Sequence, residues 1–190
     1  MKKQKTWVEI NKENLIHNVR TLKEPVKDAV FAPAVKANAY GHGICEIAPY
    51  VLEGGADWLA VDAYFEAKKL KDSGITAPIY IMGYVLKDEL PGVVENGFRM
   101  VAYNPETVRW LGEIGKDVNV HLKIETGNNR QGIDLKDLSK FIEVLKENPC
   151  VNVEGVATHF ANIEDTTDHS YAEYQLENFR KAIEMLEEAG

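Results

Sequence analysis

The chain has 190 residues, 45% of them hydrophobic and 27% charged, enough apolar material for a full core and too little length to suggest several domains. Its formal net charge of −8 argues against a nucleic-acid-binding protein, since no basic cluster with interleaved aromatic residues offsets it. No apolar run approaches the roughly 20 residues of a membrane span, and the lysine-rich start does not lead into the apolar region of a signal peptide. We therefore expect a cytoplasmic globular protein without a membrane partner.

The two cysteines, Cys45 and Cys150, lie far apart and lack CxxC spacing. This pattern indicates neither a disulfide framework nor a zinc site. We expect free thiols and no metal centre.

Strand-like and helix-like patterns alternate along the chain. Residues 6–10 predict a short strand, and Asn11 can cap a helix that must end before Pro25. Short apolar runs predict further strands at residues 29–35, 58–61, 79–82, 99–102, 118–124 and 151–157. Apolar residues at helical spacing predict helices at 44–52, 64–71, 86–94, 105–114, 135–145 and 170–189.

Six successive β/α units require a parallel sheet, either doubly wound or closed as a barrel. The barrel is favoured because no GxGxxG follows the first strand and because the candidate chemical residues follow several different strands. A closed barrel needs eight units. The predicted fold class is therefore α/β, a parallel (β/α) barrel of TIM type truncated after six β/α units.

Lys36 ends the first apolar run of these units and precedes a glycine-rich turn. Counting by twos, it shares a strand face with Ala34 and Ala32, which leave room for a flat molecule. A lysine in such a place can form a Schiff base. A surface lysine at a strand end remains the alternative.

The string Val-Lys-Ala-Asn-Ala-Tyr-Gly-His-Gly at residues 35–43 closely resembles the pyridoxal 5'-phosphate (PLP) signature of bacterial alanine racemases. The resemblance implies that Lys36 bonds covalently to PLP and acts as one of two acid/base groups. It also implies that Tyr40 contacts the cofactor phosphate.

In the strand at 118–124, apolar residues alternate with polar ones, so the polar set including Lys123 and the following Glu125 should face the barrel interior. An internal ion pair between these two is one interpretation. The turn-rich loop after them presents Arg130, whose planar fork suits a carboxylate, although a solvated loop arginine is the commoner case.

The segment Lys-Ile-Glu-Thr-Gly-Asn-Asn-Arg-Gln-Gly at residues 123–132 is similar to the same family's Lys-x-Asp-Thr-Gly-Met-x-Arg-x-Gly. The resemblance implies that Arg130 touches the substrate carboxylate and the cofactor phenolic oxygen, and that Lys123 is carbamylated and orients it. Glu125, Asn128 and Gln131 depart from the family pattern, which concerns side-chain specificity more than the carboxylate contact.

His159 follows the last predicted strand and shares its face with Ala157 and Gly155. A structural histidine is one interpretation. In the family, the histidine of this Thr-His-Phe string packs on the pyridine ring.

The resemblance thus implies a PLP-dependent racemase that interconverts L- and D-alanine by two-base proton transfer, with three strand ends meeting at one barrel mouth. Racemases for serine or a basic amino acid, and a PLP-binding homeostasis barrel without turnover, remain alternatives. In the family the second base is a tyrosine of a C-terminal β domain supplied across a homodimer. We expect residues 1–190 to be the N-terminal part of the barrel, without its last units or that domain, and inactive alone.

Overall fold

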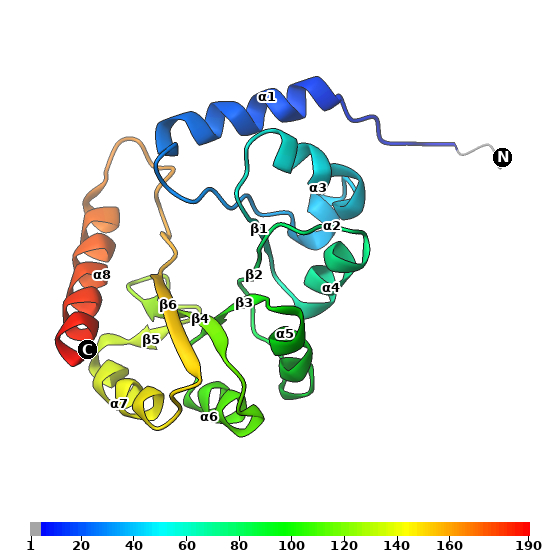
Figure 1. The fold of residues 1–190 in the computed structure, drawn as a ribbon. Helices are drawn as coiled ribbons and strands as arrows, with labels where there is room; N and C mark the ends of the chain where they lie inside the picture. Colours follow the sequence, from blue (N-terminus) through cyan, green and yellow to red (C-terminus); the bar gives the residue numbers. More distant parts are fainter. Residues whose placement is uncertain (1–4) are drawn as a thin grey trace. The chain divides into compact units, whose positions relative to one another are not determined.

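The computed structural model describes residues 5–190, which form two compact units divided between Val85 and Leu86. Both are α/β, with parallel strands followed by helices (Figure 1). From residue 59 onward, every strand and helix that the apolar spacing predicts is present.

The first unit places helices around a short parallel pair of strands. Its elements are α1 (Lys12–Lys23), η1 (Glu24–Val26), α2 (Lys36–Tyr40), α3 (Ile44–Glu53), β1 (Leu59–Val61), α4 (Tyr64–Asp72) and β2 (Ile79–Ile81). β1 and β2 are in register from Leu59 opposite Ile79 to Val61 opposite Ile81. Both are almost wholly buried, so their continuous apolar runs fit strands covered on both faces.

Two strand predictions in this unit need correction. Residues 6–10 form no strand; Trp7 and Val8 are 71% and 69% exposed, so β-forming residues alone did not produce one. Residues 29–35 are extended, but only a parallel bridge between Ala34 and Ala60 is assigned. Pro33, which has no N–H group to donate, limits the ladder there.

The second unit is built on the long strand β4. Its elements are η2 (Lys87–Glu89), α5 (Leu90–Asn96), β3 (Arg99–Ala102), α6 (Pro105–Ile114), β4 (Val118–Glu125), β5 (Ile133–Asp134), α7 (Leu135–Lys146), β6 (Val151–Ala157) and α8 (Ser170–Ala189). β4 pairs in parallel with β3 and β6, and its last two residues pair with β5. Parallel pairing brings the carboxyl ends of β4 and β6 to the same edge.

The alternation predicted for β4 is confirmed. Leu122 and Ile124 are 0% and 1% exposed, whereas Lys123 and Glu125 are half-buried on the other face. The apolar side chains of β4 therefore belong to the buried core. The polar face is therefore the one available for chemistry.

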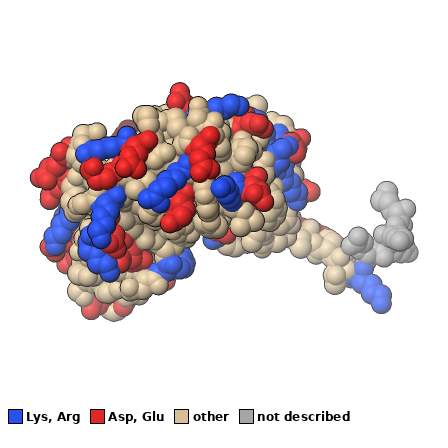
Figure 2. Space-filling model, turned by 90° about the horizontal axis from the view of Figure 1, so that it is seen from below, with Lys and Arg blue, Asp and Glu red and all other residues tan. Residues whose placement is uncertain are grey.

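The surface of the described residues mixes charges of both signs. Figure 2 shows acidic and basic side chains interspersed over the face that it displays. None of the helices that residues 5–190 form has the length and apolarity that a membrane crossing requires.

Candidate cofactor site

Lys36 lies at the carboxyl end of an extended segment, as predicted. The Val35 amide donates to the Ala60 carbonyl at 2.8 Å, and the Ala60 amide donates to the Pro33 carbonyl at 3.0 Å. Val35 is buried while Lys36 is half-buried. Pairing with β1 thus places the lysine at the end of a strand-like segment.

The backbone after Lys36 forms one left-handed helical turn. Residues 37–40 all have φ between 51° and 54°, and the Ala39 amide donates back to the Val35 carbonyl at 2.8 Å. Left-handed helix costs roughly 1–2 kcal/mol per L-residue, because Cβ crowds the following carbonyl oxygen. Four consecutive non-glycine residues in this region need support from the surrounding structure, and such strain concentrates at functional sites.

Glu66, on α4, provides that support. Its side chain is buried, its Oε1 accepts the Ala37 amide at 2.6 Å, and its Oε2 accepts the amides of Asp62 and Ala63 at 2.9 and 3.2 Å. One carboxylate therefore links the turn to the segment after β1. The sequence places Glu66 on a predicted helix, but its spacing does not predict the contact with Ala37, 29 residues away.

The Lys36 amine is accessible. Nζ lies 3.3 Å from Oδ1 of Asp62, and the two side chains are 37% and 57% exposed. Tyr40, the predicted phosphate contact, is 62% exposed. His42 instead serves the turn, since its Nδ1 lies 2.8 Å from the Ala39 carbonyl oxygen.

In the second unit, the loop after β4 carries Arg130 and is organised by Glu125. Oε1 of Glu125 accepts a bond from the Gly127 amide at 2.6 Å, and Oε2 of Glu125 accepts one from the Arg130 amide at 3.2 Å. Burial opposes ionisation of Glu125, but hydrogen bonds from the backbone of the loop outweigh it and hold the pKa of this carboxyl below its ordinary value. Gly132 closes the loop at φ 148°, where a Cβ would lie 2.4 Å from the Glu125 amide nitrogen.

Lys123 is half-buried on the polar face of β4. Burial lowers the pKa of its amine, the positive charge of Arg130 lowers it further, and Glu125 opposes the shift. Within residues 5–190 the ion pair between Lys123 and Glu125 that the sequence left open does not form, because Glu125 bonds to the loop amides. The amine is therefore more readily neutral than an ordinary lysine.

Gln175, fully buried on α8, joins the loop after β4 to the segment after β6. Its Nε2 donates to the Thr126 hydroxyl at 3.1 Å and to the His159 carbonyl at 3.0 Å, while its Oε1 accepts the Ala161 amide at 2.9 Å. The side chain of His159 is exposed beyond the end of β6. Nothing in the sequence distinguishes Gln175 from an ordinary polar position in an amphipathic helix pattern.

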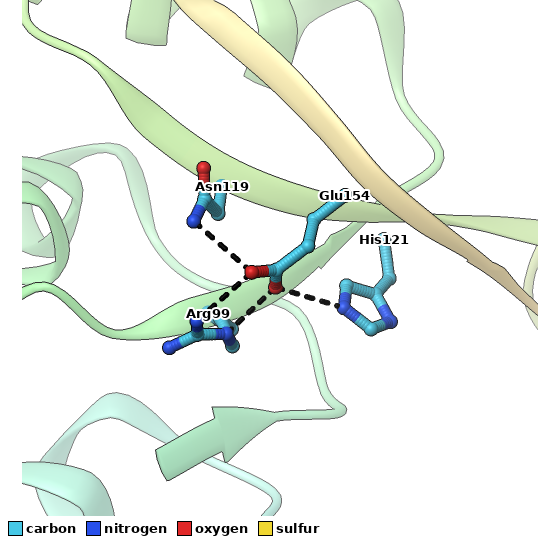
Figure 3. A network of polar contacts seen from close by, with 4 residues as sticks. All are labelled: Arg99, Asn119, His121 and Glu154. Carbon is cyan, nitrogen blue, oxygen red and sulfur yellow. Dashed lines mark hydrogen bonds and ion pairs between the residues drawn. The ribbon is translucent and has the colours of Figure 1, made fainter. Parts of the chain in front are cut away.

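A separate charged cluster lies along the amino-terminal half of the polar face of β4 (Figure 3). Glu154 on β6 accepts two bonds from Arg99, at 2.6 and 2.9 Å, and one each from Asn119 and His121, both at 3.2 Å. Burial again opposes ionisation, and bonds from Arg99 and His121 leave the pKa of Glu154 lowered. These groups satisfy one another, which suits a structural role.

The predicted site residues divide between the units. Lys36 and Tyr40 belong to the first unit, and Lys123, Arg130 and His159 belong to the second. Within the second unit, Gln175 and the parallel pairing of β4 and β6 bring the Arg130 loop and the His159 segment to one edge.

Known proteins resemble the chain over nearly its whole length. The family "Alanine racemase, N-terminal domain" matches residues 10–190. "Alanine racemase 2" of Caldanaerobacter subterraneus subsp. tengcongensis is 39% identical, over 97% of this chain and 49% of its own length. The alanine racemase of Methanococcus maripaludis is 38% identical, over 97% and 51%.

A solved structure agrees closely. The alanine racemase of Bacillus anthracis with bound L-Ala-P superimposes with a TM-score of 0.92 at 33% identity, covering 99% of this chain and 50% of that one. This agreement confirms the predicted fold class, the first part of a parallel (β/α) barrel. The chain spans about half the length of the curated relatives it matches, and it belongs to the alanine racemase N-terminal domain family.

Proposed function

We propose that the protein carrying this chain is a PLP-dependent racemase that interconverts L- and D-alanine. The observation that carries the proposal is the accessible Lys36 amine, presented at a strand end by a left-handed turn. The family membership and the alanine racemases among the relatives support it. The substrate is a small amino acid, and the setting is the cytoplasm.

The side chains of this chain fit PLP. Lys36 offers a primary amine that can bond to the cofactor aldehyde, and Tyr40 offers an exposed phenol for the phosphate. His159 offers an exposed ring for the pyridine face. When bound, PLP withdraws electrons from Cα of the amino acid and makes its proton acidic.

Lys36 holds or returns the α-proton on one face of the substrate. Inversion requires a second acid/base group on the opposite face, and we assign it to a tyrosine of the partner subunit in a homodimer, following the family pattern. Racemisation and dimer formation are therefore linked in this proposal.

Arg130 binds the substrate carboxylate through its two-pronged guanidinium. Lys123 orients it as a carbamate: the neutral amine bonds to the carbon of CO₂ and releases a proton, and the anion formed attracts Arg130. The lowered pKa of Lys123 supports this step, because only the neutral amine reacts. An arginine loop built for a carboxylate favours a racemase over a PLP carrier without turnover.

The test is borohydride reduction of the PLP-loaded full-length protein, followed by peptide mapping and assays with L-alanine, L-serine and L-lysine. We expect the label on Lys36 and turnover with alanine. A label on another lysine overturns the site. Faster turnover of serine or lysine would replace alanine as the substrate. A Lys36 label without turnover of any of the three amino acids would support a PLP carrier without catalytic activity.

A further inference from the structure

We propose that Glu66 is the positioning residue of the Lys36 turn, holding the left-handed backbone in the form that presents the amine to PLP. The inference rests on the proposed function only in taking PLP as the group that Lys36 receives. The role of Glu66 in the turn stands on geometry within the first unit.

A helix cap accounts for only part of what Glu66 does. It is the third residue of α4, where a glutamate commonly reaches back to the amide at the start of its helix. Oε2 does this with Asp62 and Ala63. Oε1 is directed elsewhere, to the Ala37 amide at 2.6 Å, so the second oxygen serves the residue that follows the reactive lysine.

The same carboxylate also fixes the counter-ion of Lys36. It holds the Asp62 amide, the Asp62 carbonyl accepts the Gly83 amide at 3.0 Å, and a Cβ on Gly83 would lie 2.3 Å from that carbonyl oxygen. The Asp62 carboxylate then lies 3.3 Å from Nζ of Lys36. Glu66 thus constrains both the backbone next to the amine and the charge that faces it.

Other polar side chains support the turn without replacing Glu66. Asn38 accepts the Ile44 amide at 3.1 Å and lies 3.4 Å from Nζ of Lys69, and His42 contacts the Ala39 carbonyl. These contacts hold the later part of the turn. Its first left-handed residue, Ala37, is held by Glu66.

The decisive variant is Glu66→Gln in the full-length protein, because glutamine keeps the volume and loses the charge and one acceptor. We expect PLP affinity to fall about tenfold, as loss of a charged hydrogen bond predicts. In the apoprotein, amide exchange should accelerate at residues 36–41 and remain unchanged in β2. The matched control is Glu89→Gln, since Glu89 caps η2 through the Leu86 amide at 3.2 Å, and it should leave both measurements unchanged.

Rescue separates positioning from general stability. Glycine adopts the left-handed conformation without a Cβ penalty, so Ala37→Gly added to Glu66→Gln should restore most of the PLP affinity. Glu66→Asp, which keeps the charge but is one methylene too short for Ala37, should give an intermediate loss, and it provides the test if Glu66→Gln fails to fold.

Two outcomes overturn the inference. Unchanged PLP affinity and local exchange in both Glu66 variants would show that the turn does not depend on Glu66. Reduced affinity with faster exchange throughout the unit and no rescue by Ala37→Gly would assign Glu66 to the fold alone. If wild-type protein carries no PLP on Lys36, the proposed function fails, while the exchange measurements still decide the role of Glu66.

Discussion

Two loops carry the proposed chemistry, and a carboxylate holds each of them differently. The turn after residue 35 is held by Glu66, which is buried and comes from the following β/α unit. The loop after β4 is held by Glu125, which is half-buried and belongs to the end of the same strand. Both carboxylates accept backbone amides, so the difference lies in the distance along the chain.

The two loops differ in how much each depends on its carboxylate. A distant anchor makes the Lys36 position depend on the folded unit, which gives the precision that proton transfer at one carbon requires. The carboxylate anchor of the Arg130 loop is local, and α8 adds longer-range bonds from Tyr171 to the Gly127 carbonyl at 2.5 Å and from Gln175 to the Thr126 hydroxyl at 3.1 Å. Several contacts therefore share the support of this loop, so weakening one of them should cost less than the loss of Glu66 costs the Lys36 turn.

The largest effect should come from removing the lysine that the distant anchor presents. Lys36→Ala should abolish the borohydride label and lower racemisation by at least the roughly 10²–10⁴-fold of a positioned acid/base group. The control is Lys68→Ala, which removes a surface lysine paired with Asp72 on α4. Residual turnover near the wild-type rate would remove Lys36 from the chemistry.

The next effect tests the loop with the local anchor. Arg130→Lys keeps the charge and loses the fork, so kcat/KM should fall by roughly 10- to 150-fold, equivalent to about 1.5–3 kcal/mol. Arg109→Lys on the exposed side of α6 is the control. Kinetics unchanged by Arg130→Lys would show a solvated arginine.

A smaller effect should follow from weakening the local anchor itself. Glu125→Gln leaves one acceptor for the loop amides, and KM should rise between about twofold and tenfold, as a lost hydrogen bond predicts, with little change at Lys36. Glu143→Gln, on the surface of α7, is the control. If the Glu125 variant impaired PLP binding as strongly as Glu66→Gln, the proposed division between the two anchors would fail.

The sequence predicted the local features of the structure and not the contacts between residues far apart in the chain. From β1 onward, apolar spacing predicted all elements except β5; residues 105–114 and 170–189 are helices with those bounds, and β3 and β6 match their predicted ranges. Local motifs predicted Lys36 at a strand end and Arg130 in a turn-rich loop after a strand, and both lie there. Patterns of period 2 and 3.6 report which face of an element is apolar, and that information suffices for these assignments.

The contacts that hold the site were not predictable in this way. Glu66 and Gln175 are ordinary polar residues within helix patterns, and their partners lie 29 and 49 residues away for Ala37 and Thr126. The left-handed turn was equally hidden, because alanine and tyrosine carry no preference for positive φ. Tertiary contacts decide all three features.

The smallest effect is a titration of the local anchor, which requires no substitution. Because the folded pKa of Glu125 lies below its ordinary value of 4.5, its contribution to loop order is complete above that pH and is lost as the pH falls through the folded pKa. We expect protection of the Gly127 and Arg130 amides, corrected for intrinsic exchange, to decrease below pH 4.5.

Glu154 also has a lowered pKa, so overall stability declines in the same range; the loop must therefore lose protection before β4 does. Glu125→Gln should remove this early step, and simultaneous loss of protection in both segments of the wild type would show that the loop has no separate anchor.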